Sequence, residues 1–130
     1  MNLDNFVKGL QHIGIPTTKM NTSIKFYESL GFSIEYCVES TQNHPNVTFM
    51  KLNSLIIELY EMKDPINKVG NIDHIALDVS NILELWEIIY SDDYKILSND
   101  IEFLPFWSKG IKFFIIEGPN YERIEFCQYL

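Results

Sequence analysis

The sequence is poor in cysteine, in basic residues and in long apolar runs, and each shortage excludes a class of protein. Its 2 cysteines, Cys37 and Cys127, are too few for a disulfide framework and lack the paired spacing of a zinc site, so both are expected to be ordinary strand residues. Only 10 Lys and Arg residues stand against 18 Asp and Glu residues, for a formal net charge of −8. Nucleic acid is therefore not an expected partner, because phosphate binding requires clustered cations.

No stretch of the chain approaches the roughly 18 apolar residues of a membrane-spanning helix. We therefore expect a cytoplasmic protein with no membrane partner. The 130 residues are 46% hydrophobic, which is enough to bury one ordinary core and predicts a single domain over residues 1–130.

A histidine-containing stretch occurs twice. Residues 11–15 read QHIGI, and residues 73–77 read DHIAL, 62 positions later. In both, apolar residues alternate with the histidine and a small residue, which predicts a half-buried strand with the imidazole on the face opposite the isoleucines. The small residues, Gly14 and Ala76, leave space beside each histidine for a ligand.

A second pair of stretches repeats with an offset of 67 and puts Glu58 and Glu125 at matched positions. The offset between the two copies thus increases from 62 to 67 residues along the chain. This increase indicates extra loop residues in the second copy, part of them at 117–119. The chain is thus predicted to be two copies of one unit, which pack together or pair across a dimer to bury their sheets. The matched stretches are 53–60 with 120–127 and 47–49 with 111–113.

Each copy is predicted to have the order βαβββ, giving modules at about 8–62 and 70–130 with a linker at 63–70. Residues 98–109 are expected to form a long loop with some extended structure. The expected elements are strands at 10–16, 32–39, 47–52 and 55–61 with a helix from Asn21 or Thr22 to about Leu30, and strands at 71–79, 94–97, 111–116 and 121–128 with a helix from Ser80 or Asn81 to about Tyr90.

Four residues suited to metal binding occupy matched positions of the two copies: His12, Glu58, His74 and Glu125. Imidazole nitrogens and carboxylate oxygens suit Zn²⁺, Ni²⁺, Co²⁺, Fe²⁺ or Mn²⁺, and two of each would give a neutral set of ligands. A single strand histidine is more often a hydrogen-bonded core residue, and a single strand glutamate usually faces solvent. The repeat therefore leaves open both a shared metal site and ordinary structural roles.

The sequence resembles the vicinal oxygen chelate superfamily, which includes glyoxalase I, extradiol dioxygenases, and fosfomycin- and bleomycin-resistance proteins. The resemblance rests on the two histidine strands, on residues 26–32 (FYESLGF) and on residues 118–126 (GPNYERIEF), and it covers nearly the whole chain. It implies an α+β fold of two βαβββ modules with curved mixed sheets that enclose a cleft. It also implies a homodimer with one divalent metal ion per site, held by His12, Glu58, His74 and Glu125.

This order of ligands is most similar to glyoxalase I. The resemblance implies a metal-dependent lyase or isomerase that acts on a small α-oxo or hydroxy compound, free or as a thiol adduct. In such an enzyme the ion polarises the substrate oxygens, and Glu125 or Glu58 carries the proton as general base and acid. The chain departs from glyoxalase I at 32–36, where basic and polar residues for the glutathione carboxylates would be expected, and at 104–110, where a glycine-rich loop would be expected.

Four further residues are candidates for substrate binding. By strand alternation, Arg123 lies on the same face of its strand as Glu125, and Tyr60 on the same face of its strand as Glu58. Arg123 is suited to a substrate carboxylate or to an ion pair with an acidic neighbour. Phe106 and Trp107 lie in the predicted loop, where they would line a binding site or pack on the sheet.

The resemblance also permits other functions. One is a metal-free drug-binding protein like the bleomycin-resistance proteins, since an acidic chain with loop aromatics suits an aromatic cation. The others are a thiol transferase of the fosfomycin-resistance kind and an Fe²⁺ dioxygenase, although the dioxygenases typically use two histidines and one glutamate.

Overall fold

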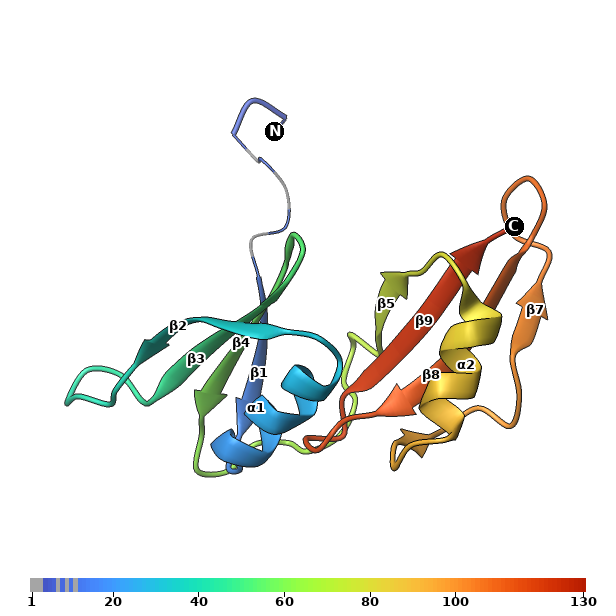
Figure 1. The fold of residues 1–130 in the computed structure, drawn as a ribbon. Helices are drawn as coiled ribbons and strands as arrows, with labels where there is room; N and C mark the ends of the chain where they lie inside the picture. Colours follow the sequence, from blue (N-terminus) through green and yellow to red (C-terminus); the bar gives the residue numbers. More distant parts are fainter. Residues whose placement is uncertain (1–3, 7, 9, 11) are drawn as a thin grey trace. The chain divides into compact units, whose positions relative to one another are not determined.

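A computed structural model of the protein describes residues 4–6, 8, 10 and 12–130 (Figure 1). The chain divides into two compact units, Met1–Pro65 (unit 1) and Ile66–Leu130 (unit 2), and the break falls inside the segment expected as the linker. Among the described residues each unit holds one helix and one sheet, of four strands in unit 1 and five in unit 2. The predicted α+β class is confirmed.

Unit 1 follows the predicted order of one strand, one helix and three strands. Its sheet has the strand order β1-β4-β3-β2, in which β1 and β4 are parallel and the other neighbours antiparallel. Strands β3 and β4 have the predicted bounds, and the tight turn at 53–54 is confirmed. The elements are β1 (Ile13–Thr17), α1 (Met20–Ser29), β2 (Ser33–Val38), β3 (Val47–Leu52) and β4 (Leu55–Glu61).

The core of unit 1 lies between α1 and one face of this sheet. Ile57 and Leu59 alternate on β4 with exposed or half-buried residues and are fully buried, as are Met50 of β3 and Tyr27 of α1. Replacing a buried leucine such as Leu59 with Ala typically removes about 2–5 kcal/mol of stability. This packing therefore fixes which face of the sheet remains free.

The beginning of α1 differs from the prediction, whereas its end agrees. The expected caps Asn21 and Thr22 are wrong, because the helix starts earlier and its N-cap residue Lys19 makes no capping bond with its side chain. Instead, the backbone N–H of Lys19 donates to Oγ1 of Thr17 at 2.8 Å. Gly31 follows the helix with a φ of +94°, a left-handed conformation that glycine adopts without strain.

Unit 2 has the strand order β5-β9-β8-β6, with the additional strand β7 paired to β8 inside the segment expected as a long loop. Strands β5 and β9 are parallel, and β8 is antiparallel to its neighbours. The elements are β5 (Ile75–Asp78), α2 (Ile82–Tyr90), β6 (Lys95–Ile96), β7 (Glu102–Leu104), β8 (Ile111–Glu117) and β9 (Arg123–Tyr129).

Of the two predicted caps of α2, Ser80 and Asn81, the structure has Asn81. Oδ1 of Asn81 accepts a hydrogen bond from the backbone N–H of Glu84 at 3.4 Å, and Nδ2 of Asn81 donates one to Oε2 of Glu84 at 2.7 Å. Trp86 of α2 packs edge-on against Phe114 of β8, with ring centroids 5.1 Å apart. Within the described residues, neither helix is long and apolar enough to cross a membrane.

The register of the parallel strands confirms the repeat around the histidines. Gly14 of β1 lies opposite Glu58 of β4, and Ala76 of β5 lies opposite Glu125 of β9. Each histidine precedes its small residue by two positions. The two copies therefore present their histidine and glutamate in the same register.

The sequence match between 47–49 and 111–113 is wrong by two residues. Phe49 lies opposite the glutamate of unit 1, whereas Ile115 lies opposite the glutamate of unit 2. Phe49 therefore corresponds to Ile115. A shift of two residues preserves which side chains face the core, so apolar alternation does not detect it.

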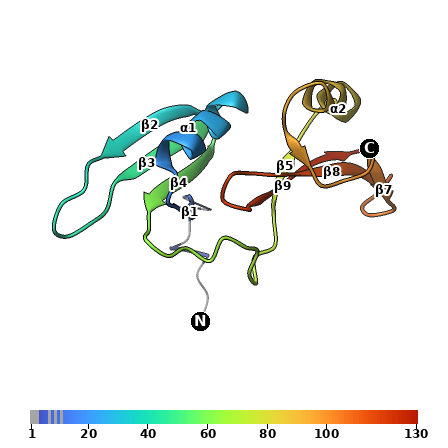
Figure 2. The same ribbon diagram turned by 90° about the horizontal axis from the view of Figure 1, so that it is seen from below.

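In each unit the helix covers one face of its own sheet (Figure 2). We call the other face the open face of that unit. Strand alternation places Phe49, Glu58 and Tyr60 on the open face of unit 1, and Glu125 and Cys127 on that of unit 2. Both candidate glutamates thus lie on the side of the sheet away from the helix.

Candidate metal centre

Unit 1 brings His12 and Glu58 together. Nε2 of His12, which precedes β1, lies 3.0 Å from Oε2 of Glu58 on β4. Gly14 lies beside this pair: a Cβ at this position would be 3.5 Å from Oε2 of Glu58 and 3.4 Å from Cε1 of Tyr60. Because a Cβ already reaches contact distance, a side chain larger than alanine would displace Glu58 or Tyr60, which explains the small residue at position 14.

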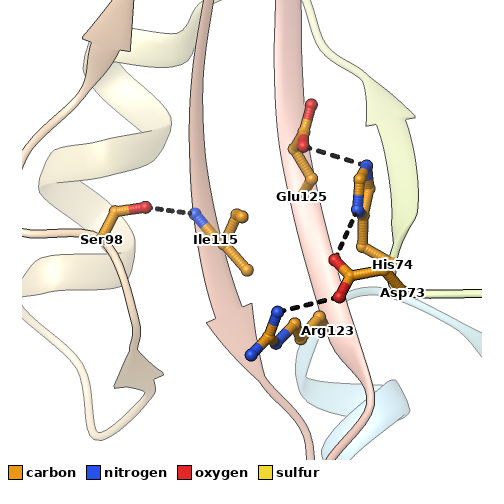
Figure 3. A network of polar contacts seen from close by, with 6 residues as sticks. All are labelled: Asp73, His74, Ser98, Ile115, Arg123 and Glu125. Atoms are coloured by element: carbon orange, nitrogen blue, oxygen red, sulfur yellow. Dashed lines mark hydrogen bonds and ion pairs between the residues drawn. The ribbon is translucent and has the colours of Figure 1, made fainter. Parts of the chain in front are cut away.

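Unit 2 brings His74 and Glu125 together in the same way. Nε2 of His74 lies 3.3 Å from Oε2 of Glu125. On the other side of the ring, Nδ1 lies 3.0 Å from Oδ2 of Asp73, whose Oδ1 accepts a hydrogen bond from Nη1 of Arg123 at 3.0 Å. Figure 3 shows this row of four side chains from Arg123 to Glu125.

The contact with Asp73 determines where His74 carries its proton. The hydrogen bond from His74 lowers the pKa of Asp73 more than burial raises it, and the charge of Arg123 acts in the same direction as the hydrogen bond. The ionised carboxylate can only accept, so Nδ1 of His74 is the donor. In the neutral ring Nε2 then presents a lone pair to the carboxylate of Glu125. Two lone pairs at this distance repel each other unless a proton or a cation lies between them.

The spacing of each pair fits two neighbouring ligands of one metal ion. With metal–donor distances of about 2.0–2.2 Å, adjacent donors in a tetrahedral or octahedral shell lie about 2.8–3.6 Å apart. The separations of 3.0 Å in unit 1 and 3.3 Å in unit 2 fall in this range. No three His, Cys, Asp or Glu side chains of the described residues form a metal cluster, and each unit brings together one histidine and one glutamate.

Cys127 lies two residues after Glu125 on the same face of β9. Burial raises the pKa of its thiol, and the negative charge of Glu125 raises it further. The side chain is therefore a neutral thiol near neutral pH and adds no negative charge to the site.

The substrate-binding candidates occupy different surroundings. Arg123 forms the ion pair with Asp73, the second of the two roles that the sequence left open. Tyr60 lies on the open face next to Glu58, with its ring against Gly14.

Of the two loop aromatics, Trp107 lies away from the histidine of its unit. Phe106 and Trp107 are exposed, and Trp107 packs edge-on against Tyr129 with ring centroids 5.6 Å apart. Tyr129 is four residues beyond Glu125, about 13 Å along the strand.

Sequence reasoning missed three residues of these sites. Phe49 packs edge-on against His12 at a centroid distance of 5.8 Å, and Tyr36 neighbours Phe49 at 6.4 Å. The two-residue turn at 53–54 contained the signal for Phe49, because it fixes the hairpin register. Asp73 was missed because a strand over 71–79 would turn it away from His74, whereas β5 begins only at Ile75.

The chain belongs to the Glyoxalase/Bleomycin resistance protein/Dioxygenase superfamily, whose model matches residues 9–126. This confirms the resemblance to the vicinal oxygen chelate proteins. A relative, the uncharacterized protein YwbC of Bacillus subtilis (strain 168), is 30% identical over 128 residues, which cover 93% of this chain and 98% of the relative.

Solved structures share the fold at lower identity. The glyoxalase family protein from Enterococcus faecalis superposes with a TM-score of 0.77 at 19% identity, over 94% of this chain and 98% of that one. A mutant of the fosfomycin resistance protein FosX from Listeria monocytogenes, complexed with Mn(II) and 1S,2S-dihydroxypropylphosphonic acid, gives a TM-score of 0.69 at 17% identity, over 93% and 90%. At these identities the comparison concerns the fold alone.

Proposed function

We propose that the protein is a divalent-metal-dependent enzyme similar to glyoxalase I, a lyase or isomerase that acts on a small α-oxo or hydroxy compound. The observation that carries the proposal is the pair of matched His–Glu contacts, at 3.0 Å and 3.3 Å, in two copies of one unit. Membership of the superfamily supports it, as does the Mn(II) bound by the FosX relative.

The proposed ligands are His12, Glu58, His74 and Glu125. Two protein donors are few for a tightly held divalent ion, whereas two such pairs supply four donors and two negative charges that neutralise it. The pairs would come from one chain or from two chains of a homodimer. Imidazole and carboxylate donors suit Ni²⁺, Zn²⁺, Co²⁺, Mn²⁺ and Fe²⁺.

Bound there, the ion would supply Lewis acidity toward the oxygens of the substrate. Glu125 is our proposed general base, which removes the proton next to the substrate carbonyl and returns it to the neighbouring atom. Its side chain is 13% exposed against 25% for Glu58, so an abstracted proton is better protected from exchange with water. Glu58 is the second candidate for this role.

Metal content tests the proposal directly. Protein stripped with a chelator and reloaded with Ni²⁺, Zn²⁺, Co²⁺ or Mn²⁺ should retain about one ion per chain after desalting. The variants His12→Ala and His74→Ala should each lose the bound ion. His44→Ala is the matched control, because this histidine is exposed and contacts the carbonyl of Pro45. Equal retention by all three variants would contradict the proposed ligand set.

Activity is then assayed on the loaded protein with small α-oxo aldehydes, with and without a thiol, by proton NMR. In D₂O the receiving carbon of the product should keep part of the substrate proton, which would report transfer by one shielded carboxylate; complete solvent deuterium there would mean that the base exchanges freely with water. A metal-free binding protein for an aromatic cation is the second candidate function, favoured by the exposed Tyr36 and the net charge of −8. Lack of metal uptake together with tight binding of such a cation would support that alternative.

Mixing two defective variants tests the proposed homodimer. If each site takes one pair from each chain, a mixed dimer of His12→Ala and His74→Ala keeps one intact site, and random exchange restores about a quarter of wild-type metal content. Absence of recovery in a protein that light scattering shows to be dimeric would assign both pairs to one chain.

A further inference from the structure

We infer that the substrate is uncharged and carries a planar apolar group, which packs against Phe49 and Tyr36 beside the His12–Glu58 pair. The inference rests on the proposed function, since it assigns the class of substrate for the same site. Two independent observations carry it: the aromatic side chains next to His12, and the pairing of the cations on the open faces.

The aromatic side chains form a continuous row across unit 1. Phe49 of β3 lies opposite Glu58 of β4 and also opposite Tyr36 of β2. The ring of Phe49 meets the imidazole of His12 edge-on, at 5.8 Å and 87°, and the tilted ring of Tyr36 follows at 6.4 Å and 35°. Both distances lie in the range of favourable aromatic contacts. A group held at Nε2 of His12 is therefore adjacent to this row.

The row also has apolar surface available for a ligand. The side chain of Tyr36 is 62% exposed, and Phe49 is half-buried. Large aromatic side chains in such positions are frequent in binding sites, because they offer a wide rigid surface with few rotatable bonds. Placed beside a pair of metal donors, they suit the apolar part of a ligand whose oxygens bind the ion.

Three cations of the described strands lie on the open faces, and each is paired with a carboxylate. Strand register places Lys51, Lys95 and Arg123 on these faces. Lys51 lies 3.6 Å from Glu35, Arg123 lies 3.0 Å from Asp73, and Lys95 forms an ion pair with Glu117. An anionic substituent would have to displace one of these carboxylates in a chain that already has a net charge of −8. The faces therefore suit a neutral substrate rather than a phosphonate.

Two hydroxamates test the inference, because both chelate a metal through the same pair of oxygens and differ only in a methyl or a phenyl group. Calorimetry on Ni²⁺-loaded protein should give benzohydroxamate about tenfold tighter binding than acetohydroxamate, from the apolar area that the phenyl group buries. Phosphonoformate, an anionic chelator, should bind more weakly than either.

Phe49→Ala should reduce the preference for benzohydroxamate over acetohydroxamate to about twofold, measured as the ratio of the two affinities on fully Ni²⁺-loaded protein. Tyr36→Ser, at an exposed position that the fold tolerates, should reduce the preference by a smaller factor. Tyr90→Ala removes an exposed aromatic side chain from α2 and should not alter it.

Equal affinities of the wild-type protein for the two hydroxamates would overturn the inference, as would an unchanged preference in Phe49→Ala or tighter binding of phosphonoformate. In each of these results the metal is bound, so the proposed function stands. Lack of Ni²⁺ binding by the wild-type protein would overturn the proposed function and this inference together.

Discussion

The carboxylate of Asp73 lies 3.0 Å from Nδ1 of His74, on the side of the imidazole ring away from Glu125. The two residues are adjacent in the chain, just before β5, and Arg123 holds the carboxylate from β9. A histidine so held keeps its proton on Nδ1 and its ring orientation, which improves Nε2 as a metal donor. The matched residue of the first copy is the uncharged Gln11, so the two copies differ at this position.

Asp73→Asn should weaken metal binding without unfolding the protein. The amide introduced at position 73 holds the Nδ1 proton of His74 less strongly than the carboxylate does. Loss of a carboxylate partner of a metal-binding histidine typically lowers metal affinity by about 10–100-fold. Competition with a chromophoric chelator measures the change. Asp64→Asn, in the segment between the units, is the control and should bind like the wild type; equal affinity in both variants would contradict this role of Asp73.

Asp73 also predicts a pH dependence of stability in the metal-free protein. Its pKa is lowered in the folded state, chiefly by the hydrogen bond from His74, so its stabilising contribution is complete above the unfolded value of 3.8 and is lost as the pH falls through the folded pKa. Urea unfolding of wild type and Asp73→Asn should therefore differ at pH 6 and converge at acid pH. A difference that persists at pH 2.5 would point to packing instead.

Glu125→Gln should abolish turnover and preserve the fold. The amide keeps the shape of the side chain but cannot accept the substrate proton, and loss of a general base commonly lowers kcat by about 10²–10⁴-fold. Steady-state kinetics with circular dichroism measure both properties, and Glu102→Gln on β7 serves as the control. Full activity of Glu125→Gln would show that Glu125 is not the general base. Glu58 would then be the candidate, and Glu58→Gln would test it.

The two cysteines should differ in reactivity. Burial and the charge of Glu125 raise the pKa of Cys127, and the thiolate is the reacting form, so Cys127 should be alkylated slowly at pH 8. Cys37 is exposed and should react first. Mass spectrometry of the iodoacetamide-treated protein shows which cysteine is alkylated first, with Cys37→Ser and Cys127→Ser as references. Faster labelling of Cys127 would mean that its surroundings in solution are more open.

The local parts of the fold followed from the sequence. Apolar alternation predicted β3 and β4 with their bounds, and the polar residues before the second helix limited its cap to Ser80 or Asn81, of which the structure has Asn81. The first helix shows the limit of such signals, because Thr17, three residues before α1, binds the helix start in place of the expected caps.

The repeat and its four matched residues also follow from the sequence alone, because the spacing of His12, Glu58, His74 and Glu125 is a property of the chain. Which side chains contact these four residues depends on the folded structure. It paired Phe49 with His12 and turned Asp73 toward His74 and Arg123. Strand register and the end of a strand are set by contacts between distant segments, which a pattern of alternating residues leaves unchanged when strands shift by two positions.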